Sequence, residues 1–190
     1  MKKPVVRFRV QPVLASGLLV AAVVLAGLLI VPATPAQAAD IVASPALERG
    51  DGTRLEFLLR RIQLVRDGLE YRIDLARQAA DIAQDWIDVL SEEGHDVSTL
   101  QAALDDYRAG VDAAEESLNT ATSVLDEHAG FDDEGKVTDR DQAIETLRNA
   151  GRPLRDAHRT LRDATIQFRR AVQDFRRQAL EDAGGSQTDQ

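Results

Sequence analysis

The architecture of this chain follows most directly from residues 98–129, STLQAALDDYRAGVDAAEESLNTATSVLDEHA. Apolar side chains recur in this stretch in alternating steps of four and three residues, which is the spacing of one face of an α-helix. This face consists of Leu100, Leu104, Tyr107, Val111, Ala114, Leu118, Ala121, Leu125 and His128. Gly94 and Gly130 flank the stretch and are typical of helix ends. We therefore expect one long helix, with Ser98 as N-cap and Gln101 completing a capping box.

The same spacing continues on both sides of this stretch. Residues 54–93 contain no proline and carry two parallel apolar rows, the second of which (Leu58, Val65, Ala79 and Trp86) is interrupted at Arg72. Residues 139–183 pair large apolar residues with alanines three positions further on. The main rows are Leu55, Ile62, Leu69, Ala76, Ala83 and Leu90 in the first segment, and Leu147, Leu154, Leu161, Phe168 and Phe175 in the last. Long helices with short connections predict an all-α, elongated antiparallel three-helix bundle with coiled-coil-like packing. We expect Thr138 to cap the third helix, and Gly151 and Pro153 to cause a break near residues 151–153.

The beginning of the chain has the pattern of an export signal. Four cations (Lys2, Lys3, Arg7 and Arg9) precede the apolar residues 13–31, and Ala36-Gln37-Ala38 forms a small-x-small cleavage site. We expect a signal peptide over residues 1–38, or an uncleaved anchor, because the apolar run is just long enough to span a bilayer. Both alternatives predict an exported protein of the periplasm, cell surface or medium. We expect a linker over residues 39–52, the bundle over 53–183 and a disordered tail over 184–190.

Composition excludes several classes of protein. The sequence contains no cysteine, so it has no disulfide, thiolate metal ligand or cysteine nucleophile. Its formal net charge is −9 and becomes −13 once the four cations of the signal are removed. A chain this acidic is repelled by phosphate, so we expect no nucleic-acid partner, and membrane contact only if the signal segment is retained.

Charges follow the same seven-residue spacing as the core. Arginines at 148, 155, 162, 169 and 176 form one row of the third helix, and Asp105, Asp112 and Asp126 form a row of the second. We interpret these rows as charge complementarity between neighbouring helices. The alternative is an arginine strip that binds an anionic cell-wall polymer or another exported protein.

The sequence gives little sign of catalytic chemistry. The three histidines (His95, His128 and His158) are far apart in the expected bundle, and the motifs HExxH, GxSxG and GxxxxGK[ST] are absent. In the turn FDDEGKVTD (131–139), placing Gly135 at position 6 of an EF-hand puts Gly130 where an acid is required. This turn is a solvated connection or a weak calcium site. We expect a non-enzyme without cofactor or resident metal.

The first helix also carries a second apolar row. This row consists of Phe57, Leu64, Tyr71, Leu75, Ile82 and Val89. In a three-helix bundle, each helix needs only one buried face, so the row requires an explanation. Three are open: the first helix is central and packs on both sides, residues 39–50 cover the row, or the row is an exposed surface for a partner or a homodimer.

Three segments resemble an uncharacterised group of bacterial exported all-helical proteins. The turn HAGFDDEGKVTD (128–139) carries the likeness, together with GHDVSTLQAAL (94–104) and LRDAHRTLRDA (154–164). The resemblance implies a signal peptide followed by helices, with an HAGFDxxGKVTD-type turn between the second and third, and it implies no activity. We therefore expect a structural or protein-interaction module of the cell envelope. The alternative is a periplasmic-type stress chaperone, or a self-associating dimer, that uses the second apolar row.

Overall fold

A computed structural model describes residues 52–185 of the chain, and it consists of three long α-helices. They are α3 (Gly52–Glu92), α4 (Ser98–Glu127) and α5 (Arg140–Gly185). The all-α, three-helix prediction is confirmed, and each bound lies within two residues of the expected one. The signal peptide and most of the linker fall on residues 1–51, outside the described residues, as does most of the expected tail, although residues 184 and 185 belong to α5.

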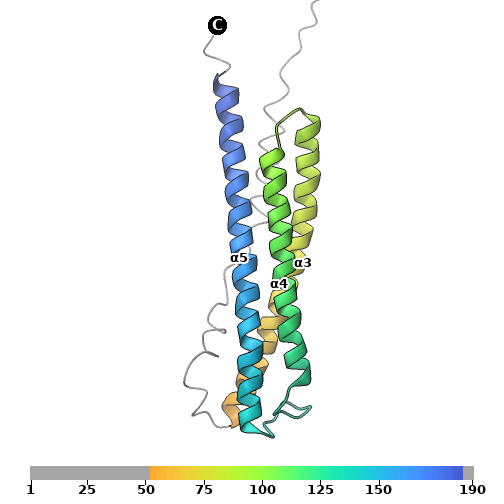
Figure 1. Cartoon of the computed structure of the whole chain (residues 1–190), viewed down its shortest axis with the longest axis vertical. Coiled ribbons are helices and arrows are strands. Elements are labelled where there is room, and N and C mark those ends of the chain that lie inside the picture. The colour runs from red at the N-terminus through yellow and green to blue at the C-terminus, as the bar shows by residue number, and fades with distance from the viewer. Residues whose placement is uncertain (1–51, 186–190) are drawn as a thin grey trace, which may run out of the picture.

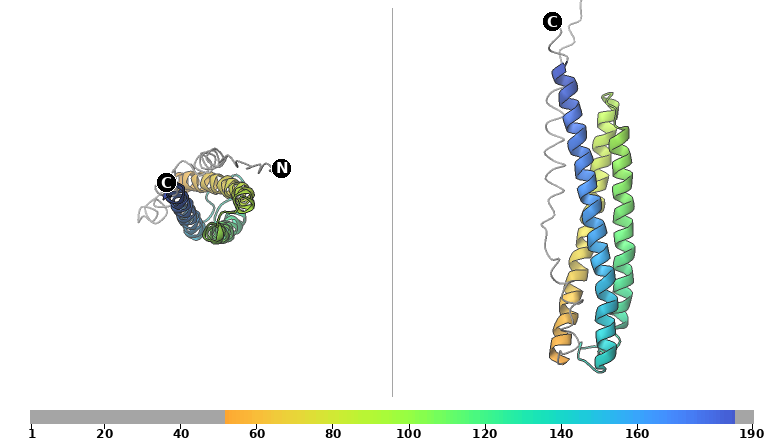
Figure 2. Two further views of the ribbon diagram at one scale, coloured as in Figure 1. Left: turned by 90° about the horizontal axis from the view of Figure 1, so that it is seen from above. Right: turned by 60° about the vertical axis from the view of Figure 1, so that its left-hand side comes forward.

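The three helices lie side by side along one long axis (Figure 1). Viewed down that axis, they occupy the corners of a triangle (Figure 2). Residues 93–97 connect α3 to α4 at one end, and residues 128–139 connect α4 to α5 at the other. In Figure 1, α3 is inclined to the other two helices: it begins behind α5 and ends beside the start of α4. The last turns of α5 extend beyond the ends of α3 and α4.

The core is built from the residues that the periodicity selects. The members of the main rows of α3, α4 and α5 are buried, except that His128 and Phe175 are only partly buried. Buried apolar surface stabilises by about 25 cal/mol per Å², so these rows supply the main driving force for helix association. The core also includes Ile144 and Phe131, which lie outside the expected rows.

Small residues allow α4 and α5 to approach closely. Ala114, Ala121, Ala143, Ala150 and Ala157 are fully buried. At Gly110 of α4, a Cβ atom would lie 2.5 Å from the Cβ of Ala164 in α5. Real Cβ atoms do not approach this closely, so glycine is the residue that this contact accommodates.

The connection between α4 and α5 is a closely hydrogen-bonded turn. His128 ends α4 in the left-handed conformation with φ of 34°, and Gly130 follows with φ of 84°. The carbonyl of Gly130 accepts from the Thr138 amide at 2.9 Å, and an isolated β-bridge joins Phe131 to Val137. Phe131 is buried, so the turn closes this end of the core.

Three local expectations are wrong. Ser98 makes no capping hydrogen bond from its side chain. Instead, the carboxylate of Asp96 accepts from the Ser98 amide at 3.0 Å. Asp139, and not Thr138, caps α5, since its Oδ1 accepts from the Asp141 and Gln142 amides. The break near residues 151–153 is absent, because α5 continues through Pro153. The carbonyl that loses its partner there belongs to Asn149, an exposed residue, and packing of the flanking Ala150 and Leu154 holds the helix together.

Candidate functional site

The second apolar row of α3 lies on the outside of the bundle. We call its six residues (Phe57, Leu64, Tyr71, Leu75, Ile82 and Val89) the outer row. The side chains of Phe57, Leu64 and Tyr71 are 60%, 72% and 63% exposed, and Val89 is 43% exposed, whereas Leu75 and Ile82 are partly buried. Large apolar side chains exposed to this degree lose the stabilisation that burial would give. The interpretation in which α3 packs on both sides is therefore wrong for these four residues.

The outer row is continuous along the helix. Phe57, Leu64 and Tyr71 are seven residues apart, so they follow one line on α3. Gly68 lies between Leu64 and Tyr71 on the same face, and nothing lies within 4 Å of the position that its Cβ would take. The row therefore forms an open apolar strip, most exposed over the first half of α3.

An acidic column borders the outer row on one side. It consists of Asp67, Asp74, Asp81 and Asp88, which are seven residues apart and exposed. Asp67 pairs with Arg66 at 2.8 Å, and Asp88 accepts from Gln84 at 2.9 Å. Asp67 comes three positions after Leu64, and Asp74 comes three positions after Tyr71, so on a helix the acids are direct neighbours of the apolar side chains.

Ion pairs between α3 and α4 lie on another side of α3. Arg77 binds both carboxylate oxygens of Glu115, one of them at 2.6 Å, and lies 3.6 Å from Asp112. The hydrogen bond raises the pKa of Arg77 and lowers the pKa of Glu115. Arg66 lies 3.6 Å from Asp126 in the same contact. These pairs support the interpretation of the aspartate row of α4 as charge complementarity, with α3 as the partner helix. They are exposed, so each contributes little to stability.

A polar contact interrupts the core between α3 and α5. The Nη1 of Arg72 donates to Nδ1 of His158 at 3.1 Å, and both side chains are partly buried. Within the described part of the chain, Nε of Arg72 is buried without a hydrogen-bond partner. Burial lowers the pKa of Arg72. Burial also lowers the pKa of His158, and the positive charges of Arg72 and Arg162 lower it further.

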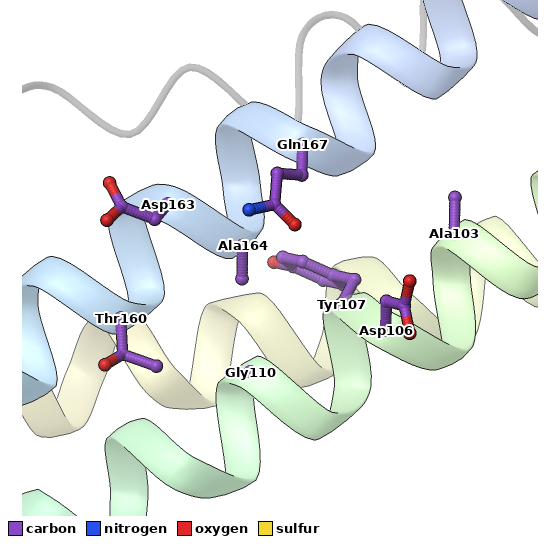
Figure 3. Close-up of a pocket in the computed structure, with 8 residues that line it drawn as sticks. All are labelled: Ala103, Asp106, Tyr107, Gly110, Thr160, Asp163, Ala164 and Gln167. Carbon is purple, nitrogen blue, oxygen red and sulfur yellow. The ribbon is translucent and has the colours of Figure 1, made fainter.

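A groove between α4 and α5 surrounds Tyr107 (Figure 3). The ring of Tyr107 stacks on Phe168 with centroids 5.2 Å apart, and Figure 3 shows its hydroxyl end next to Ala164, with Gln167 above the ring in this view. Burial raises the pKa of Tyr107, so its phenol stays protonated at neutral pH. The acids of this groove are Asp106 of α4 and Asp163 of α5. The Asp163 carboxylate pairs with Arg162 at 2.9 Å.

A second groove lies beside the last turns of α5. Leu100, Ala171 and Phe175 form part of its lining, and Arg170 and Asp174 contribute charges. It has a volume of 880 Å³ and is open to solvent. Its polar residues are of both signs and do not converge on one ligand type.

The histidines and the acidic turn are engaged separately. Nδ1 of His128 contacts the carbonyl oxygen of Asp126 at 2.7 Å, and Nε2 of His95 lies 3.9 Å from Glu93. Oδ1 of Asp132 accepts from the Glu134 and Lys136 amides, at 3.0 and 2.8 Å. Asp132 thus stabilises the backbone of the turn. Among residues 52–185, no group of three histidine or acidic side chains is placed to hold a metal ion.

Comparisons with protein-family models, with curated proteins and with solved structures give no significant match. Within the helices that the structure describes, none combines the length and apolar character that a membrane crossing requires. Periodicity alone identifies the outer row, whereas no sequence pattern indicates that the partner of Arg72 is His158.

Proposed function

We propose that this protein is a non-enzymatic, exported helical protein that serves as a structural or protein-interaction module of the cell envelope. The outer row of α3 is its binding surface. One observation carries the proposal: Phe57, Leu64 and Tyr71 are more than half exposed, although the main rows of all three helices are buried. Exposed apolar strips with polar borders are typical of protein–protein contact sites.

Export is the second part of the proposal, and its support comes from the sequence. The basic residues, the apolar run and Ala36-Gln37-Ala38 follow the order of a secretory signal. The residues of the turn 128–139 support a place among the bacterial exported helical proteins that the sequence resembles. The lack of a catalytic motif in the sequence supports a role without chemistry.

We further propose that the three helices form an antiparallel bundle with coiled-coil-like packing. Two features support it: the connections 93–97 and 128–139 are short, and buried residues recur every seven positions. Such a bundle is a rigid support, so it would hold the outer row straight over about 48 Å, at 1.5 Å per residue.

Site-specific photo-crosslinking tests the binding surface. A photoreactive side chain replaces Leu64 in the full chain expressed in a bacterial host, and a control variant carries it at Ile166, an exposed apolar residue of α5. We expect discrete protein adducts from position 64, and their loss when Phe57→Asp is added. Equal yields of adducts from positions 64 and 166 would contradict the proposal, since they would show that the crosslinks come from random collisions and not from binding at the outer row.

The second candidate function is a stress chaperone, which the same exposed row favours. The full chain should then slow the aggregation of an unfolded client at a near-stoichiometric ratio, and Phe57→Asp with Leu64→Asp should abolish this. The matched control is Ile166→Asp with Leu180→Asp, which adds the same charge on α5. No effect of the unaltered chain on aggregation would end the chaperone hypothesis.

A further inference from the structure

We propose that the outer row binds a basic amphipathic helix of a partner protein, with apolar residues at heptad spacing and lysine or arginine beside them. The inference rests on the proposed function, because it assigns the chemistry of the partner for the same surface. It is carried by the placement of the acidic column next to the exposed apolar strip. Both features follow the seven-residue spacing by which one helix recognises another.

The exposed face of α3 is patterned as a second coiled-coil seam. The seam positions alternate in steps of four and three residues and include Arg61, Gly68, Gln78 and Asp85 between the members of the outer row. A partner helix on this seam would insert side chains between Phe57, Leu64 and Tyr71, and Gly68 leaves room for one of them. The spacing therefore favours a helix over an extended strand, whose side chains repeat every two residues.

The acidic column lies where such a partner would place its flanking charges. In a coiled coil, the positions directly beside the seam face the partner helix and select it by charge. On α3 these positions are Asp67, Asp74, Asp81 and Asp88. Asp74 and Asp81 are exposed, and they form no ion pair within residues 52–185. A partner with cations along this edge would pair with them, and an acidic partner would be repelled.

A second copy of this chain does not offer an apolar helix face bordered by cations. Two α3 helices packed antiparallel on their outer rows would bring the acidic columns together, with Asp74 of one copy facing Asp74 of the other. On α5, which is rich in arginine, the exposed large apolar residues among those described are Ile166 and Leu180, which are 14 positions apart. Within the described residues, α4 exposes no large apolar side chain. Each face of a second copy therefore lacks either the apolar row or the positive charge.

Two designed peptides test this proposal on the full chain. The basic peptide has four heptads with leucine in the seam and lysine at the flanking positions, and the acidic peptide has glutamate in place of the lysines. Like charges keep each peptide from pairing with itself. Binding is followed by the fluorescence anisotropy of labelled peptide, at about 0.02 M and about 0.5 M salt, where screening differs strongly. We expect the basic peptide to bind more tightly, and more so at low salt.

The decisive variant is Asp74→Lys with Asp81→Lys. We expect it to weaken binding of the basic peptide roughly tenfold at low salt, since attraction becomes repulsion at two flanking positions. Because the whole chain is acidic, a control must carry the same change of charge elsewhere. Glu116→Lys with Glu145→Lys meets this need, since both residues are exposed on α4 and α5. An equal loss in the control would overturn the proposal, because it would show attraction to net charge alone.

The remaining outcomes separate this proposal from the proposed function. In one outcome, both peptides bind with equal affinity, Asp74→Lys with Asp81→Lys leaves that affinity unchanged, and Leu64→Asp abolishes binding. The outer row would then bind helices without a preference for basic ones. The inference then fails and the proposed function stands. If neither peptide binds, whether because another part of the chain covers the row or because it has no affinity for helices, the inference is overturned. A dimer that Leu64→Asp dissociates would overturn it as well.

Discussion

Arg72 of α3 and His158 of α5 are joined by a hydrogen bond of 3.1 Å between Nη1 and Nδ1. Arginine can only donate, so Nδ1 of His158 is the acceptor and the proton of the neutral ring resides on Nε2. Protonation of Nδ1 would remove this acceptor and place a second cation beside Arg72. The contact is therefore compatible with neutral histidine and incompatible with its charged form.

This contact predicts a pH dependence of stability. Burial, aided by the charges of Arg72 and Arg162, lowers the pKa of His158 below the value of about 6.5 expected in the unfolded chain. The unfolded state then binds more protons, so stability should be full above about pH 6.5 and fall as the pH decreases toward the lowered pKa. Urea denaturation between pH 5 and 7 measures the slope, and His158→Gln should reduce it. An unchanged slope in that variant would show that other groups cause it.

Arg72 itself is predicted to reduce stability. It is in register with the apolar residues Val65 and Ala79 of α3, which lie seven positions before and after it. Its pKa is lowered by burial, and its Nε is buried without a partner among the described residues. A buried donor without a partner costs about 1–3 kcal/mol, and an apolar side chain of similar length removes this cost. We expect Arg72→Met to raise the free energy of unfolding. Arg66→Met, at an arginine paired with Asp67 and Asp126, should not raise it. A lower melting temperature for Arg72→Met would contradict this prediction.

Two glycines within helices should respond to alanine in opposite directions. A Cβ added at Gly68 would meet nothing within 4 Å, so Gly68→Ala should stabilise by about 1 kcal/mol, the difference in helix propensity. At Gly110 the new Cβ would lie 2.5 Å from the Cβ of Ala164, a rigid methyl group. Overpacking costs about 1–3 kcal/mol, which exceeds the gain in propensity, so Gly110→Ala should destabilise. Thermal unfolding of both variants measures the difference, and stabilisation by Gly110→Ala would mean that α4 and α5 separate easily.

Periodicity predicted most of the fold, because a long helix buries its residues at a constant spacing. Leu104 and Leu147 are buried for that reason. Phe131 and Thr146 are buried for a different reason, because the turn 128–139 folds over this end of the core. The hydroxyl of Thr146 donates to the carbonyl of Ala129 in this turn at 2.8 Å. No local pattern marks such residues, since their environment depends on where the chain returns.

The sequence predicted which residues form the outer row, but it did not predict whether another helix covers them. The seven-residue spacing identifies Phe57, Leu64 and Tyr71 as one row, but spacing does not say whether another helix covers it. That depends on how α4 and α5 are rotated about α3. The same rotation brings Arg72 to His158, 86 positions further along the chain.

The helix caps allow a direct comparison between the sequence pattern and the structure. The pattern Ser98–Gln101 predicts a capping box, yet the structure shows no capping hydrogen bond from the Ser98 side chain, and Gln101 bonds to Gln84 instead. Asp139 accepts from two free amides at the start of α5, at 3.0 and 3.1 Å. Because unbonded amides at a helix start require an acceptor, we expect Asp139→Ala to cost about 1 kcal/mol.

Ser98→Ala provides the matched comparison, because it removes the hydroxyl that the sequence pattern selects. We expect it to lower the free energy of unfolding by only about 0.3 kcal/mol, well below the range for loss of a cap. Asp139→Asn should retain most of the stability, since its amide oxygen can still accept. Urea midpoints of the three variants decide between the caps. A larger loss for Ser98→Ala than for Asp139→Ala would restore the capping box and show that α4, and not α5, depends on its first residue.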